Sequence, residues 1–215
     1  MPKSSPFCKC YFVIVCKRMD QLIDSLKDEN IEELGNLLKE GSIAVIPTDT
    51  QYGIVTSALQ NESVEKIYQL RKRSPEKPMI ILLGSISQLQ DFNITLTNNQ
   101  LTQVTSLWPN PVSIIFPVTN PNLAYLHRGK NSLAFRIPQN KWLLKLLAVS
   151  GPLVAPSANW EGETPASTIA DAKKYFSDQI ATYVDNGEMN NPPSTILKMT
   201  ESGFEIIRQG SFKLT

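Results

Sequence analysis

The stretch that decides the fold is residues 42–59, SIAVIPTDTQYGIVTSAL, in which a polar loop separates two apolar runs. Residues 42–47 predict a buried strand that ends at Pro47, because proline has no backbone N–H to donate to a neighbouring strand. Residues 54–59 predict a second strand. The loop between them, residues 48–53, therefore follows a strand end, which is a common place for ligand contacts in α/β proteins.

Helices are predicted on both sides of this segment. Before it, Asn30 and Glu33 form a candidate capping box for a helix that ends near Gly41. After it, an amphipathic pattern that begins near Asn61 predicts a helix ending in basic residues. The later strands are predicted at 79–83, 112–118, 133–137, 153–155 and around residues 181, 194 and 204, and the later helices at 86–92, 98–108, 142–149 and 169–176.

The alternation of strands and helices predicts one α/β domain. The last two strands lie close together around Gly203, which predicts antiparallel pairing there and a mixed sheet overall. The chain of 215 residues is 41% hydrophobic and 19% charged, a composition typical of a globular domain. It has 21 Lys and Arg against 20 Asp and Glu, so a polyanion would have to be bound locally.

The counts of histidine and cysteine restrict metal chemistry. A single histidine, His127, excludes a site built on a pair of histidines, and three cysteines are too few for an all-cysteine structural zinc site. We therefore expect no metal ligands among the side chains. His127 lies in a polar, basic stretch and is expected to be an ordinary surface residue.

All three cysteines, Cys8, Cys10 and Cys16, fall in the first sixteen residues, which is a poor disulfide framework. This predicts a protein of a reducing compartment, the cytoplasm. The apolar run at 11–16 is too short for a membrane span or a signal peptide. Residues 1–18 are interpreted as an N-terminal extension or an extra strand.

Three polar segments are candidates for a site. Residues 71–78, RKRSPEKP, carry four cations at the end of a predicted helix, where they either complement the helix dipole or bind an anion. Residues 48–50 and 157–159 each follow a predicted strand, and each is either a local turn or a ligand contact. The glycine-rich motifs of common nucleotide sites are absent from the sequence, so a nucleotide site here would be built differently.

Together with later segments, these motifs resemble the YrdC family, the threonylcarbamoyl-AMP synthases. The matching segments, in the family's order, are PTDTQYG (47–53), the basic stretch ending at 77–78, RIP (136–138), PSAN (156–159), VDNG (184–187) and PST (193–195). The resemblance covers about residues 30 to 210. Six short motifs in one order are far more specific than any one of them.

The resemblance implies a single-domain α/β fold at residues 19–215, with a twisted mixed parallel and antiparallel sheet, flanking helices and a large open cavity. It implies a nucleotidyltransferase that forms threonylcarbamoyl-adenylate and pyrophosphate from L-threonine, bicarbonate and ATP, with Mg²⁺ carried by ATP. Partner proteins, the tRNA threonylcarbamoyl transferases, would pass the product to tRNA. Direct RNA binding is a further expectation, and no membrane partner is expected.

The resemblance also assigns roles to residues of this chain. The catalytic residues would be Arg71, Arg73, Ser157 and Asn159. ATP would be bound by Arg73, Lys77, Ser132, Ser157, Asn159 and Arg208. L-threonine would be bound by Thr50, Arg136 and Ser194. The sequence departs from the family's pattern at Arg71, where a lysine is usual, and at Ser113, where a threonine is common.

Two other interpretations stay open. One is a module of the same fold that binds a nucleotide or double-stranded RNA without turning it over. The other is an adenylating relative that acts on carbamoyl phosphate. The hydroxyl and amide residues Thr50, Ser157, Asn159 and Ser194 favour the synthase over the RNA-binding module, because RNA binding by shape needs cations but no hydroxyl-lined pocket.

Overall fold

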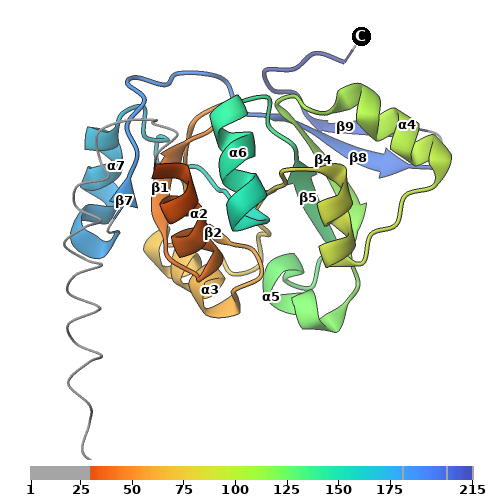
Figure 1. Cartoon of the computed structure of the whole chain (residues 1–215). Helices are drawn as coiled ribbons and strands as arrows, with labels where there is room; N and C mark the ends of the chain where they lie inside the picture. Colours follow the sequence, from red (N-terminus) through yellow and green to blue (C-terminus); the bar gives the residue numbers. More distant parts are fainter. Residues whose placement is uncertain (1–29, 181, 202, 215) are drawn as a thin grey trace, which may run out of the picture.

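A nine-stranded mixed sheet forms the centre of the protein (Figure 1). The structure, a computed structural model, describes residues 30–180, 182–201 and 203–214. The strands are β1 (Ala44–Pro47), β2 (Tyr52–Ser57), β3 (Ile81–Leu82), β4 (Val112–Pro117), β5 (Ser132–Arg136), β6 (Leu153–Val154), β7 (Thr182–Tyr183), β8 (Thr195–Thr200) and β9 (Gly203–Arg208). Their order across the sheet is β7-β1-β2-β6-β3-β5-β4-β8-β9. The pairs β1/β7, β3/β5 and β4/β8 are parallel and the other five are antiparallel, so the predicted mixed sheet is confirmed.

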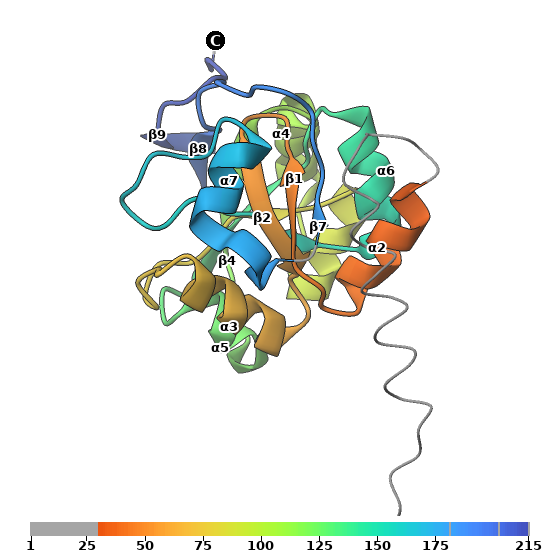
Figure 2. The same cartoon turned by 90° about the vertical axis from the view of Figure 1, so that its left-hand side faces the viewer.

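Helices cover both faces of this sheet. The α-helices are α2 (Ile31–Lys39), α3 (Asn61–Leu70), α4 (Asn98–Leu107), α5 (Ala124–His127), α6 (Lys141–Ser150) and α7 (Ile169–Phe176). The 3₁₀ helices are η3 (Ile86–Phe92), η4 (Pro121–Leu123) and η5 (Ser177–Gln179). Figure 2 shows α2 and α6 on one side of β1 and β2, and α3 and α7 on the other.

The alternation of side chains along the strands explains the two layers. In β1, Ala44 and Ile46 pack in a core cluster with α2 and α6, whereas Val45 packs in the larger cluster that includes residues of α3 and α7. In β5, Leu133 and Phe135 point into the larger cluster. Successive side chains of a strand point to opposite faces, so Arg136 projects toward the face that α6 covers in part.

Three sequence predictions need correction. The strand predicted at 79–83 pairs only at Ile81 and Leu82. Asn30 is the N-cap of α2 but makes no side-chain cap hydrogen bond, so the capping box with Glu33 does not form. His127 ends α5 and is only 5% exposed, so it is not a surface residue.

His127 is buried because its short helix, α5, packs against the rest of the fold. The charged residues beside it in the sequence do not reveal this packing. Its Nδ1 accepts a hydrogen bond from the Gly129 backbone at 3.2 Å.

The cysteines and the proposed extension at 1–18 lie outside the described residues. Within the described ranges, no helix has the length and apolar character needed to cross a membrane.

Candidate functional site

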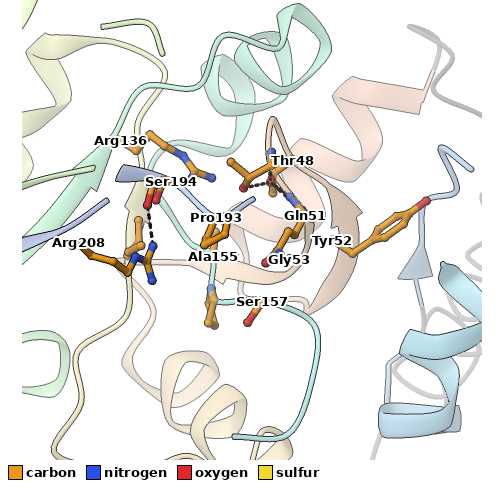
Figure 3. Close-up of a pocket in the computed structure, with 13 residues that line it drawn as sticks. Thr48, Gln51, Tyr52, Gly53, Arg136, Ala155, Ser157, Pro193, Ser194 and Arg208 are labelled. Atoms are coloured by element: carbon orange, nitrogen blue, oxygen red, sulfur yellow. Dashed lines mark hydrogen bonds between the residues drawn. The ribbon is translucent and has the colours of Figure 1, made fainter. Parts of the chain in front are cut away.

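A pocket of about 100 Å³ lies where several strands begin or end (Figure 3). Its lining residues are Thr48, Thr50, Gln51, Tyr52, Gly53, Ile80, Arg136, Ala155, Pro156, Ser157, Pro193, Ser194 and Arg208. All of them lie within three residues of a strand end, in or beside β1, β2, β3, β5, β6, β8 and β9. The pocket brings together five residues that the sequence predicted for the site: Thr50, Arg136, Ser157, Ser194 and Arg208.

The loop after β1 is held by the hydroxyl of Thr48. Its Oγ1 accepts hydrogen bonds from the backbone N–H groups of Thr50 and Gln51 at 3.1 and 3.2 Å, and donates to the Gln51 carbonyl at 2.7 Å. This is a Ser/Thr turn, which fixes the backbone of a tight loop. The Thr48 and Thr50 hydroxyls are 3.1 Å apart, so the turn also places Thr50.

Arg136 forms a buried ion pair with Asp49 beside the pocket. Its Nη2 lies 3.1 Å from Asp49 Oδ1, and the two side chains are 5% and 7% exposed. Burial lowers the pKa of Arg136, and Asp49 opposes that shift. Nearby Arg208 adds to the lowering of the Arg136 pKa, because like charges disfavour protonation. The pocket wall therefore holds two guanidinium groups against one carboxylate.

The wall opposite the Thr48 loop is built by the start of β8 and the end of β9. Arg208 Nη2 donates to the Ser194 carbonyl at 2.7 Å, which fixes the guanidinium at the pocket rim (Figure 3). The Ser194 and Ser113 hydroxyls are 3.0 Å apart and buried. Ser113 thus supplies the hydroxyl partner of Ser194 at the position where the family commonly has a threonine.

Gly53 lets the loop after β6 reach the pocket. It pairs with Ser157 through an isolated antiparallel bridge. A Cβ on Gly53 would lie 3.2 Å from Thr48 Cγ2 and 3.4 Å from the Pro156 carbonyl oxygen. The absence of a side chain therefore permits this close approach of the two loops.

Asn159 and Arg71 lie directly behind the pocket lining. Ser157 Oγ donates to Asn159 Oδ1 at 2.6 Å, and Arg71 Nη2 lies within hydrogen-bond distance of both side chains. Arg71 is 3% exposed and Asn159 is 4% exposed. Burial lowers the pKa of Arg71 to about 10.

The other cations of the basic segment are engaged at its surface. Arg73 donates to the carbonyls of Lys77 and Pro78 at 3.0 and 2.9 Å. Lys77 pairs with Glu161 at 2.7 Å, and Glu161 also accepts from the Ser74 backbone. These contacts stiffen the segment as a loop that lies against residues 157–161. Arg73 and Lys77 do not line the pocket.

A second hollow, of about 260 Å³, shares Ile80 with the pocket. It is lined by Pro78, Met79, Ile80, Ile115, Lys130, Ser132, Leu133, Ala134, Ile196 and Ile207. Ser132, which the sequence assigned to ATP, lies here with the cation Lys130 at the same wall. Trp160, which follows Asn159 in the sequence, lines another hollow together with Tyr175.

Tyr52 connects the pocket to residues 184–187. Its hydroxyl donates to the Gly187 carbonyl at 2.7 Å and accepts from the Asn186 backbone at 2.9 Å. Burial raises the pKa of Tyr52 to about 12. Because the pKa is higher in the folded state than the ordinary value of 10, the neutral phenol stabilises the fold below pH 10, and this contribution is lost as pH rises through about 12.

Tyr52→Phe is therefore expected to lower the unfolding free energy by about 1–3 kcal/mol at neutral pH, the usual effect of leaving a buried hydrogen-bond partner unsatisfied. The difference from the wild type should shrink above about pH 10. Denaturant unfolding at neutral pH and above pH 10 measures the difference in unfolding free energy between the variant and the wild type. Tyr175→Phe, which removes an exposed hydroxyl bond to Thr164, is the matched control and should have a smaller effect. An equal effect in the two variants would contradict the role of Tyr52.

Sequence reasoning missed several of the residues in this site. The sequence places Asp49 in a polar loop but predicts no role for it, and it indicates Thr48, Gln51, Tyr52 and Gly53 only as parts of a motif. Their common signal is their position at a strand exit. The pattern gave no indication that Asp49 would pair with an arginine 87 positions further along the chain.

The fold and the pocket define an α/β protein with a small hydroxyl-lined site that carries net positive charge, a combination suited to an anionic, hydroxylated ligand. Comparison with known proteins identifies the group. The family described as "Telomere recombination", Sua5/YciO/YrdC, matches residues 36–210. The chain belongs to this family, and the resemblance predicted from the sequence is confirmed.

Named relatives agree with this placement. The chain is 31% identical over 190 residues to the threonylcarbamoyl-AMP synthase of Bacillus subtilis, covering 86% of this chain and 55% of that protein. It is 28% identical over 187 residues to the threonylcarbamoyl-AMP synthase of Vibrio campbellii, covering 85% of this chain and 100% of that protein.

Among solved structures, Sua5 of P. abyssi complexed with L-threonine superimposes with a TM-score of 0.79 at 26% identity, covering 87% of this chain and 57% of that one. The chain thus spans little more than half the length of the Bacillus and P. abyssi proteins. The shared structure confirms the predicted fold class.

Proposed function

We propose that this protein is a threonylcarbamoyl-AMP synthase, which forms threonylcarbamoyl-adenylate and pyrophosphate from L-threonine, bicarbonate and ATP. The observation that carries the proposal is the pocket itself. It gathers Thr50, Arg136, Ser157, Ser194 and Arg208, which come from distant parts of the sequence, into one hollow. Two relatives with 31% and 28% sequence identity bear this enzyme's name.

The residues that line the pocket suit the binding of L-threonine. The carboxylate of threonine would lie against the Arg136 guanidinium, since a planar fork of donors matches a carboxylate. The hydroxyls of Thr50 and Ser194 would bind the polar groups of the amino acid. The P. abyssi Sua5 structure is a complex with L-threonine, which supports L-threonine as the substrate.

The nucleotide would occupy the region from the pocket toward the second hollow. Arg73, Lys77, Ser132, Ser157, Asn159 and Arg208 are the residues proposed to bind ATP. Cations and preorganised donors are what phosphoryl transfer mainly requires, because its catalysis depends on positioning and on neutralising charge. Mg²⁺ would arrive with ATP and neutralise further charge.

The chemistry needs no protein nucleophile. The threonine nitrogen bonds to the bicarbonate carbon with loss of water, and a carbamate oxygen then attacks the α-phosphorus of ATP while pyrophosphate leaves. The residues proposed to serve this step are Arg71, Arg73, Ser157 and Asn159. Arg71 would act through its contacts with the Ser157 and Asn159 side chains. The product would pass to tRNA threonylcarbamoyl transferases. A cytoplasmic location and direct RNA binding stay predictions.

The test is pyrophosphate release from ATP by the purified chain, with and without L-threonine and bicarbonate, together with mass analysis for threonylcarbamoyl-adenylate. We expect release that requires both co-substrates. Release that needs carbamoyl phosphate instead would identify the adenylating relative. Tight binding of ATP or double-stranded RNA without turnover would identify the binding module.

A further inference from the structure

We propose that Arg71 is a positioning residue, whose guanidinium holds Ser157 and Asn159 in the geometry that the substrate requires without contacting the substrate itself. The proposal rests on the synthase function proposed above. It concerns the one position of the basic segment at which this chain differs from the usual lysine of its family.

The contacts of Arg71 all point toward one segment. Its Nε donates to the Asn159 carbonyl at 3.0 Å, and its Nη2 lies 3.2 Å from Asn159 Oδ1 and 3.3 Å from Ser157 Oγ. In return, the Arg71 carbonyl accepts from the Glu161 backbone at 2.8 Å. The side chain and the backbone of one residue therefore fix the loop from 157 to 161.

Asn159 is in turn hydrogen-bonded to the rest of the same loop. Its Nδ2 donates to the carbonyls of Trp160 and Glu163 at 2.7 and 2.8 Å, so the amide group is fully engaged with its own loop. The Oδ1 atom is left facing the Ser157 hydroxyl and Arg71. Arg71 thereby sets the direction of Ser157 and Asn159, two of the side chains proposed to serve the catalytic step.

Arg71 is not among the residues that line the pocket. It is 3% exposed, whereas Ser157 lines the pocket directly. The remaining nitrogen, Nη1, is buried and, within the described residues, has no hydrogen-bond partner. Two of the three guanidinium nitrogens, Nε and Nη2, are therefore bonded to the loop at 157–159, and the third is enclosed away from solvent.

A lysine cannot reproduce this arrangement. The guanidinium presents its donors in a fixed plane and from separate nitrogens, so that one edge bonds a backbone carbonyl while another reaches two side-chain oxygens. An ammonium group concentrates its donors on one atom at the end of a flexible stem. A residue that acted only through its charge would, by contrast, tolerate the exchange.

The deciding variant is Arg71→Lys, and its matched control is the reverse exchange at the adjacent position, Lys72→Arg. Lys72 is exposed and lies over the Trp160 ring at 3.2 Å, a contact that an arginine can also make. Two readouts are needed: steady-state kinetics for ATP and L-threonine, and hydrogen exchange of residues 157–166 by mass spectrometry in the absence of substrates.

We expect Arg71→Lys to lower kcat about 10- to 100-fold, the effect of a small misplacement of catalytic groups, while the KM for L-threonine stays unchanged. Hydrogen exchange in 157–166 should become faster in this variant and stay at the wild-type rate in Lys72→Arg. Wild-type activity of Arg71→Lys would overturn the proposal. Loss of activity with unaltered exchange would also overturn it, because it would indicate direct contact with substrate.

The exchange measurement keeps this proposal separate from the proposed function. If the wild-type chain forms no threonylcarbamoyl-adenylate, the proposed function fails, and the exchange of 157–166 still decides whether Arg71 holds the loop. If the wild type is active and Arg71→Lys exchanges and reacts as the wild type does, only the positioning role fails.

Discussion

The Arg136→Gln variant is expected to lose about 3–5 kcal/mol of unfolding free energy, because it leaves the Asp49 carboxylate buried without its partner. Its kcat/KM for L-threonine should also fall roughly 30- to 1,000-fold. This corresponds to about 2–4 kcal/mol of transition-state stabilisation, within the range for truncating one side of a buried charge pair. The structural basis is the 3.1 Å ion pair between two side chains that are at most 7% exposed.

Stability and activity can be separated with a second variant. Asp49→Asn combined with Arg136→Gln removes both charges, so no buried charge is left without a partner, which is the costly outcome of the single variant. The double variant should therefore recover most of the unfolding free energy while the threonine-dependent activity stays low. Denaturant unfolding and initial-rate kinetics on the wild type, both single variants and the double variant measure the two effects.

Three outcomes would contradict this account. An Arg136→Gln protein with wild-type stability would show that Asp49 does not depend on Arg136. A wild-type KM for L-threonine in that variant would remove Arg136 from the proposed threonine site. Recovery of activity in the double variant would show that the activity loss came from the stranded carboxylate and not from the missing guanidinium.

Local patterns were sufficient for most of the fold. The strand-loop-strand pattern at 42–59 predicted β1 and β2 within two residues at each end, and the helix predicted at 169–176 is α7 itself. These elements bury one clear apolar face, so periodicity determines them. By contrast, β3 is paired in register with β5 and β6 only at Ile81 and Leu82, although single backbone hydrogen bonds continue at Ile80 and Leu83. Such tertiary limits leave no trace in the apolar run at 79–83.

The candidate site was predicted unevenly for the same reason. Residues at strand exits, such as Thr50 and Ser157, were recognised because their motifs sit at predicted boundaries. The burial of Arg71 was not foreseen, since a run of cations at a helix end is typical of a solvated surface. Which of the four cations in 71–77 turns inward depends on where α3 ends and on the loop at 157–161, and neither is encoded in the charges themselves.

Arg73→Ala is expected to lower kcat/KM for ATP roughly 30- to 1,000-fold. This corresponds to a loss of about 2–4 kcal/mol of transition-state stabilisation, the effect of removing one preorganised donor from a site where charge develops. Arg73 is partly exposed and lies two positions after the buried Arg71. Its Nε and Nη2 donate to the carbonyls of Lys77 and Pro78, which orients the guanidinium and holds the loop that carries Lys77. The variant therefore removes a cation and also loosens the position of a second one.

Lys72→Ala is the matched control, because it removes the same charge from the adjacent position of the same segment. Lys72 lies over Trp160 and has no place in the proposed ATP site, so this variant should keep its kcat/KM for ATP within about threefold of the wild type, in line with the modest value of an exposed cation–π contact. Equal losses in Arg73→Ala and Lys72→Ala would indicate that the segment contributes only a diffuse positive field. A difference between the wild type and Arg73→Ala that vanishes at high salt would point the same way, because screening removes a long-range field but not a direct hydrogen bond. A loss confined to Arg73→Ala would place the phosphate contact at that guanidinium.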